Sequence, residues 1–210
     1  METLASTGLV TATAHVPALT PVGVKLITGL SWTQITDPTD LPRMEGIYLW
    51  AEAADGPIHY HGRAAGGDGL ARRVGNEIRW QAEHSAQVAE YRAESGDDVS
   101  LLDSWAIEQV PLVRVAAARG LTGFFAVAQR APWRVEGNRD APDPQLPSSA
   151  HEWESFVGEV SRMLLGHRGL LGGGAWENKR ASLADRMAQV AWLRLRQLAA
   201  DGLIPAPQII

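Results

Sequence analysis

The stretch GIYLWAEAADGPIHYHG, residues 46–62, decides what kind of fold this chain is expected to form. Two short runs rich in aromatic and aliphatic residues flank a turn signal at Asp55-Gly56, which is typical of a β-hairpin. Because side chains alternate across a strand, Tyr48 and Tyr60 are expected to share one face as cross-strand neighbours. The hairpin therefore predicts an antiparallel sheet with two of the chain's three tyrosines on one side.

The segments around the hairpin predict helices and one further strand. A glycine-rich loop precedes a helix from Leu70, and GFFAVAQRAPWRV (123–135) is the best later strand. Ser149 with Glu152 forms a capping-box signature for one helix. Ser182 with Asp185 resembles a second capping box, for a helix that closes at Gly202. We expect an α+β fold, a small antiparallel β-sheet (the hairpin plus a third strand) flanked by α-helices.

The domain organisation follows from the same pattern and from the length of 210 residues, which suits one domain. Residues 1–40 are an expected extension and turn-rich lead-in, extended or partly disordered over 1–30. Residues 41–180 form the expected main domain, with helical segments within 85–120. Residues 181–210 add a C-terminal helix that packs on the same domain.

Composition excludes several classes of protein. The chain has no cysteine, so disulfides and thiolate metal sites are excluded, and a reducing cytoplasm is the expected location. No window is apolar enough for a transmembrane helix. The N-terminal METLASTGLV lacks the positive charge of a secretory signal. The sequence therefore predicts a cytoplasmic protein with no membrane partner.

Charge is unevenly distributed along the chain. The net charge is −5, which taken alone argues mildly against a polyanionic partner. Residues 160–196 nevertheless carry seven bases against two acids, about +5. This span predicts a basic face, while two solvated helix faces of opposite charge are the plainer alternative.

The two tyrosines lie in triplets that resemble those of the GIY-YIG nuclease family. Gly46-Ile47-Tyr48 matches the first triplet in full, and Tyr60-His61-Gly62 departs from the second at its middle residue. The resemblance covers roughly residues 41–180. It implies a metal-dependent endonuclease that hydrolyses DNA phosphodiester bonds, in restriction or defence, in a mobile element or in repair.

The resemblance also implies a set of site residues. Arg73 fits the essential arginine of the helix that follows the hairpin, with Arg72 as the alternative. Glu159 fits the metal-binding glutamate, with Glu154 second, and Asn178 fits the asparagine that ends the family pattern. In these roles Tyr48 helps to activate the water, Tyr60 orients it, Arg73 binds phosphate oxygens and Asn178 positions the backbone.

The implied cofactor is Mg²⁺ or Mn²⁺, because one glutamate with waters and a substrate phosphate is enough to hold such an ion. The implied partner is double-stranded DNA, with RNA as the alternative. The bases expected to contact nucleic acid are Arg63, Arg72, Arg162, Arg168, Lys179 and Arg180. His61 is an accessory candidate that would tune the tyrosines or the nucleophile near neutral pH.

Plainer interpretations stand beside each assignment. The tyrosines would then be half-buried strand aromatics, and Arg73 and Glu159 would form surface ion pairs with Glu77 and Arg162. One rival function is a module that binds nucleic acid without cleaving it. A more distant rival is a hydrolase or binding protein that holds a metal through His59 and His61, which are expected on the face opposite the tyrosines.

Overall fold

The structure is a computed structural model that describes residues 19–78, 121–136, 144–165 and 181–205. The sheet in these residues has four strands in the order β1-β4-β2-β3, and each adjacent pair is antiparallel. The strands are β1 (Thr33–Gln34), β2 (Gly46–Ala51), β3 (Ile58–Ala64) and β4 (Thr122–Val127). The helices are α1 (Pro21–Thr28), a short 3-10 helix (Pro38–Asp40), α4 (Ala150–Leu165) and α5 (Ala181–Ala200). Residues 69–78 are also helical and are called the 69–78 helix.

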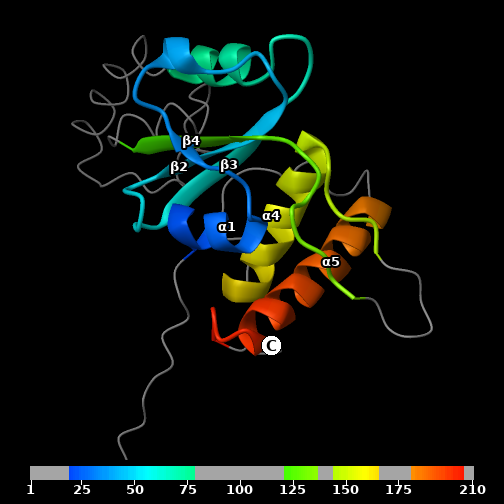
Figure 1. Ribbon diagram of the computed structural model, residues 1–210. Helices are drawn as coiled ribbons and strands as arrows, with labels where there is room; N and C mark the ends of the chain where they lie inside the picture. The colour runs from blue at the N-terminus through cyan, green and yellow to red at the C-terminus, as the bar shows by residue number, and fades with distance from the viewer. Residues whose placement is uncertain (1–18, 79–120, 137–143, 166–180, 206–210) are drawn as a thin grey trace, which may run out of the picture.

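This arrangement confirms the predicted α+β fold, with the hairpin formed by β2 and β3. Figure 1 shows α1, α4 and α5 on one side of the sheet. The face toward them is called the apolar face, because Ile47, Leu49 and Ala51 of β2 join the core residues of these helices there. The alternate residues Tyr48 and Trp50 pack on the other face with the 69–78 helix. That second face is called the tyrosine face.

A β-bulge interrupts the hairpin and changes the alternation along β3. Trp50 pairs with Tyr60, yet Ala51 pairs with Ile58, so His59 is an extra residue opposite no partner. Ile58 consequently joins the core of the apolar face, while Tyr60 packs on the tyrosine face. The bulge therefore places Ile58 and Tyr60, which are two positions apart, on opposite faces of the sheet.

α4 begins with the capping box that the sequence predicts. The Ser149 hydroxyl accepts the Glu152 amide N–H at 3.3 Å, and the Glu152 carboxylate accepts the Ser149 amide N–H at 3.2 Å. Trp153 and Phe156 then point into the apolar core, where both are fully buried and meet edge to face at 5.4 Å. The capping box therefore fixes the start of a helix whose first two turns supply large core residues.

The prediction for the N-terminal segment is wrong from residue 19 onward. The Thr20 hydroxyl caps α1 by accepting the Gly23 amide N–H at 3.0 Å, Pro21 follows, and Gly29 ends the helix at φ +65°. Val24 is almost fully buried and belongs to the apolar core. Residues 19–30 are therefore part of the same core as the main domain, and the turn-rich lead-in includes β1.

Two other boundaries differ from the prediction. β4 ends at Val127 instead of continuing to 135. Beyond the strand, Pro132 has no amide N–H for a ladder, and the Trp133 indole N–H donates to the Thr28 carbonyl at 2.8 Å. α5 already includes Ala181, so Ser182 lies inside the helix rather than at its cap.

The predicted end of α5 at Gly202 is confirmed. Gly202 has φ +71°, its amide N–H donates to the Ala199 carbonyl, and that of Leu203 donates to the Leu198 carbonyl. These two bonds form a Schellman motif, in which glycine supplies the left-handed residue. Along the described ranges no helix is long and apolar enough to cross a membrane.

Candidate functional site

The two tyrosines share the tyrosine face, as the hairpin predicts, but they are diagonal rather than directly opposed. Tyr48 pairs with Gly62, Trp50 pairs with Tyr60, and the tyrosine ring centroids lie 5.9 Å apart. Gly62 is needed for this contact, because a Cβ at that position would lie 2.5 Å from the Tyr48 hydroxyl oxygen. The glycine of the second triplet therefore makes room for the tyrosine of the first.

The 69–78 helix is fixed against the loop that precedes β2. Gly69 has φ +43° and passes so close to Met44 that a Cβ would overlap its carbonyl oxygen. The Leu70 amide N–H then donates to that carbonyl at 2.9 Å, which satisfies one of the open donors of the first turn. Leu70 and Val74 are fully buried. This anchoring determines which side of the helix faces Tyr48.

Arg73 and Glu77 project from that side at a spacing of four residues. The Tyr48 hydroxyl donates to Glu77 Oε1 at 2.6 Å, and Arg73 Nε lies 3.0 Å from the same oxygen and donates to the Tyr48 hydroxyl at 3.2 Å. The Trp50 indole N–H donates to Glu77 Oε2 at 3.2 Å. The four residues Tyr48, Trp50, Arg73 and Glu77, with Tyr60, are called the tyrosine cluster.

The plainer interpretation of Arg73 and Glu77 as an ion pair is correct, but the pair does not lie wholly on the surface. The pair forms, but Glu77 is 0% exposed, whereas the Arg73 side chain is 45% exposed. A buried carboxylate is stable only when hydrogen bonds and charge compensate its lost hydration, and Tyr48, Trp50 and Arg73 do so here. Glu77 is the main functional candidate that sequence reasoning missed, and its spacing from Arg73 was the available signal.

Burial changes the acidity of every titratable member of the tyrosine cluster. Burial raises the pKa of Tyr48 well above its usual value, and the nearby Glu77 carboxylate adds to the shift. Burial and Glu77 also raise the pKa of Tyr60, against hydrogen bonds with Tyr48 and Arg73. Burial raises the pKa of Glu77 too, although its hydrogen bond from Tyr48 and the charge of Arg73 oppose that shift. Both tyrosines are therefore neutral at physiological pH, and Glu77 is a stronger proton acceptor than an exposed glutamate.

For Arg73, the cationic member of the cluster, burial acts on the pKa in the opposite direction. Burial alone would lower the pKa of Arg73, but Tyr48 and Glu77 raise it above its usual value. Arg73 therefore stays charged and directs a half-exposed guanidinium toward solvent beside two phenols. Such a group suits the binding of a phosphate oxygen.

The two candidate glutamates of α4 lie on different flanks of the helix. They are five residues apart, which is about 140° around a helix axis. Glu154 Oε2 accepts from Arg63 Nη1 of β3 at 2.9 Å, and Glu159 Oε2 accepts from Arg162 Nε at 2.8 Å. Burial raises the pKa of Glu154, and the charges of Arg63 and Arg73 oppose this shift. The charge of Arg73 thus links Glu154 to the tyrosine cluster.

The histidines do not form the pair that His-x-His chelation needs. His59 Nε2 contacts Glu52 Oε1 at 2.8 Å, whereas His61 is 4% exposed on the apolar face, where it faces Gly158 of α4. Burial lowers the pKa of His61 to about 4. His61 is consequently neutral at physiological pH and lies on the opposite face from the tyrosines it was expected to tune.

The remaining predicted residues are scattered or lie beyond the described ranges. Arg72 is exposed next to Arg73, and Arg162 is exposed beside Glu159 on α4. The expected site and nucleic-acid contacts Arg168, Asn178, Lys179 and Arg180, and the expected helices within 85–120, lie outside the described residues. Among the residues that the structure describes, no three His, Cys, Asp or Glu side chains gather as metal ligands.

Comparison with known proteins gives no relative from which roles are transferred. Neither a family model, nor a curated protein, nor a solved structure matches this chain. The case for a functional site therefore depends on the geometry of the tyrosine cluster and on the sequence pattern alone.

Proposed function

We propose that this protein is a metal-dependent endonuclease that hydrolyses phosphodiester bonds of double-stranded DNA in the cytoplasm, with RNA as the alternative substrate. One observation carries the proposal: Tyr48, Tyr60 and Arg73, which are separate in sequence, meet around one buried carboxylate, Glu77. Phosphodiester hydrolysis needs a positioned water, a cation for the phosphate and an acceptor for the proton of the water. The tyrosine cluster has a residue for each of these needs.

The solvent exposure of each side chain in the tyrosine cluster suggests its role in the proposed reaction. Tyr60 is partly exposed, whereas Tyr48 and Glu77 are both fully buried. In the proposed step Tyr60 Oη takes the proton of the attacking water and passes its own proton to Tyr48, which passes its proton to Glu77 Oε1. The new P–O bond forms as the bond to the leaving oxygen breaks, and solvent protonates that oxygen. Neutral tyrosines with raised pKa values suit this relay, which needs no free phenolate.

Arg73 binds the phosphate in this scheme. Its Nε is engaged by Tyr48 and Glu77, and the half-exposed guanidinium is oriented by those two contacts. A fixed guanidinium favours one orientation of the phosphate oxygens relative to the phenols. Arg73 therefore couples substrate position to the proton relay.

Glu154 is the residue proposed to hold Mg²⁺ or Mn²⁺, in place of Glu159. Its carboxylate is 16% exposed and lies within reach of the charge of Arg73, and one carboxylate with waters and a substrate phosphate fits such an ion. When bound, the metal would neutralise charge that develops on the phosphate and on the leaving oxygen. Arg63 would hold the carboxylate in place.

The test is plasmid nicking with Mg²⁺ or Mn²⁺, using Glu154→Gln and Glu159→Gln as a matched pair on one helix. Glu154→Gln and Tyr60→Phe are expected to reduce cleavage roughly 10²-fold or more, whereas Glu159→Gln stays within a few-fold of the unmodified protein. Cleavage that persists in both Glu154→Gln and Tyr60→Phe would refute the mechanism. Circular dichroism of each variant controls for folding.

A second function, nucleic-acid binding without cleavage, is favoured by one observation. Tyr48 and Glu77 are both 0% exposed, and Arg73 neutralises the carboxylate, an arrangement that also stabilises a purely structural core. In that case no metal produces nicking, and binding of a labelled duplex weakens as salt concentration rises. Substitution of Arg73 would then reduce affinity without any cleavage to lose.

A further inference from the structure

A cavity of about 520 Å³ lies apart from the tyrosine cluster, beside the chain that follows β4. It is lined by Arg130, Arg134, Val135, Pro144, Gln145, Leu146 and Ser148. Val135 belongs to the apolar core, and Leu146 packs against that core. The cavity is therefore formed with the α1, α4 and α5 side of the sheet, and its size is that of small-molecule sites.

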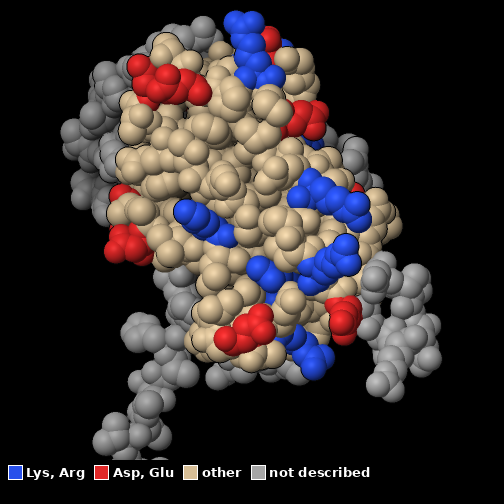
Figure 2. Space-filling model, viewed as in Figure 1, with Lys and Arg blue, Asp and Glu red and all other residues tan. Residues whose placement is uncertain are grey.

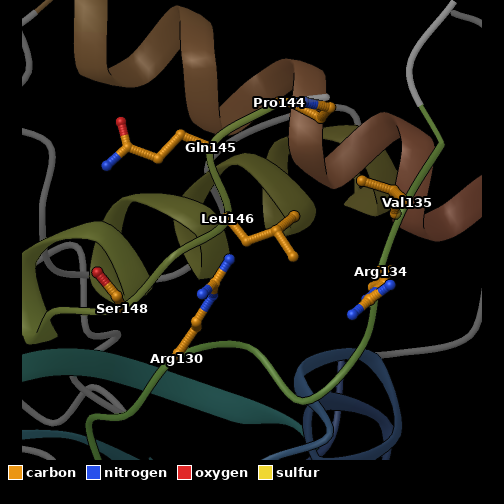
Figure 3. A pocket seen from close by; sticks show the side chains of 7 residues that line it. All are labelled: Arg130, Arg134, Val135, Pro144, Gln145, Leu146 and Ser148. Carbon is orange, nitrogen blue, oxygen red and sulfur yellow. The ribbon is translucent and has the colours of Figure 1, made fainter. Parts of the chain in front are cut away.

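The lining of the cavity is cationic on one side and apolar on the other. In Figure 3 the Arg130 and Arg134 side chains point toward the same space, which Leu146 and Val135 also face. Neither arginine pairs with a carboxylate of the described residues, and both are exposed to solvent. None of the lining residues that the structure describes is acidic. Two unpaired guanidinium groups beside an apolar wall favour an anionic ligand that has an apolar body.

The polar groups at the margin strengthen this preference for an anion. Gln145 Oε1 already accepts from Arg186 Nη1, which leaves the amide NH₂ of Gln145 as its available group. The Ser148 hydroxyl donates to Glu152 Oε2 at 2.9 Å, and Arg186 pairs with Glu152 Oε1, so the charge of the Glu152 carboxylate is compensated. On the face seen in Figure 2, basic side chains are interspersed with acidic ones. The cavity itself thus offers the Gln145 amide NH₂ and two guanidinium groups to an anion.

We propose that this cavity binds a nucleoside monophosphate, either free or as part of a nucleic-acid strand. Arg130 and Arg134 bind the phosphate, and Leu146, Val135 and Pro144 contact the base. The proposal is independent of the endonuclease function, because the cavity and the tyrosine cluster belong to the cores on opposite faces of the sheet.

The test is calorimetric titration of the full chain in EDTA with AMP, adenosine, inorganic phosphate and a short single-stranded oligonucleotide. AMP is expected to bind at one site, with adenosine at least tenfold weaker. The double variant Arg130→Gln with Arg134→Gln is expected to bind AMP at least tenfold more weakly. Substitution of Arg196, an exposed arginine of α5, by Gln is expected to change the affinity for AMP less than twofold. Since both cavity arginines are exposed and unpaired with the described carboxylates, the double variant is expected to fold.

The choice of ligand distinguishes a free nucleotide from a nucleotide that is part of a strand. AMP binding that depends on the two arginines supports a free nucleotide, and oligonucleotide binding with the same dependence but no AMP binding supports a strand. Equal affinity in the double variant, or equal affinity for AMP and adenosine, overturns the proposal, as does the absence of binding by both AMP and oligonucleotide. Arg73→Gln distinguishes the two proposals, because it is expected to abolish nicking and to leave AMP binding unchanged.

Discussion

The two faces of the sheet are built from alternate residues of one six-residue strand, yet they bury different chemistry. On the apolar face Ile47 and Leu49 join the core with Phe156. On the tyrosine face Tyr48 and Trp50 direct a hydroxyl and an indole N–H to one carboxylate. Apolar packing is roughly proportional to the area buried, whereas each polar contact depends on one atom pair. The apolar face therefore determines stability, and the tyrosine face determines a specific arrangement.

The largest expected effect is on the apolar face. Phe156→Ala is expected to destabilise the protein by about 3–5 kcal/mol, because the ring is fully buried between Trp153 and Trp133 and leaves a cavity. Urea denaturation measures the change. The exposed Val22→Ala of α1 is the control and should stay within about 0.5 kcal/mol. Equal effects of the two substitutions would contradict the assigned core.

The next prediction concerns His61, the polar exception on the apolar face. Its pKa of about 4 lies below the usual 6.5, so its contribution to stability is complete above pH 6.5 and is lost as the pH falls toward 4. The loss is about 3 kcal/mol for this shift. His61→Leu is expected to remove this part of the pH dependence. Urea midpoints of both proteins at pH 7 and pH 4 measure it, and identical pH slopes would count against the buried neutral imidazole.

A smaller effect is expected from Glu77→Gln on the tyrosine face. The Glu77 carboxylate is buried and has contacts with Tyr48, Trp50 and Arg73, so its loss should lower the free energy of unfolding by about 1–3 kcal/mol. The raised pKa of Glu77 means that its contribution is fully present below about pH 4.5 and declines as the pH rises through the folded value. Glutamine lacks this decline, so the difference between variant and parent should shrink with rising pH.

Thermal or urea unfolding over pH 4–8 tests this prediction, with the exposed Glu45→Gln as the matched control. A difference between Glu77→Gln and the parent that grows with pH would mean that the hydrogen bonds from Tyr48 and Trp50 outweigh burial. In that event Glu77 would have a lowered pKa and would be a poor final acceptor in the proposed relay.

The smallest prediction compares one glycine from each face. Gly158→Ala in α4 should stabilise the protein by about 0.5–1 kcal/mol, because the new Cβ lies 3.8 Å from His61 and alanine favours a helix. Gly62→Ala should destabilise it, because its Cβ would overlap the Tyr48 hydroxyl. Differential scanning calorimetry measures both. Stabilisation by both substitutions would show that the tyrosine face is loosely packed.

The sequence predicts those parts of the fold that have strong local signals. Asp55-Gly56 between two strand-like runs predicts the hairpin, and the Ser149 capping box predicts the start of α4. α1 was not predicted because it lies in the Thr-, Ala- and Val-rich segment 1–30, whose composition favours extended chain, and its helix signals are confined to its caps, Thr20 and Gly29. Local signals therefore mark the ends of elements more reliably than composition identifies their type.

The site was less predictable, because burial and helix orientation are properties of the whole fold. The spacing of Arg73 and Glu77 predicts that they pair, but only packing against Tyr48 makes Glu77 a buried partner. The sequence pattern favours Glu159, with Glu154 as the second choice. Their flanks on α4 separate them, and that separation depends on where β3 lies against the helix.

The extra residue in the hairpin limits which changes in length the chain tolerates. With His59 opposite no partner, Ile58 enters the apolar core while Tyr60 remains on the other face. If His59 were deleted, Ile58 and Tyr60 would become neighbours in a regular strand, which still places them on opposite faces, so both cores would keep their residues. A deletion between Tyr60 and Ala64 would instead turn part of β3 to the wrong face. In this hairpin, natural variants are therefore expected to differ in the identity or the presence of the bulged residue and to agree in the number of the residues that follow it in β3.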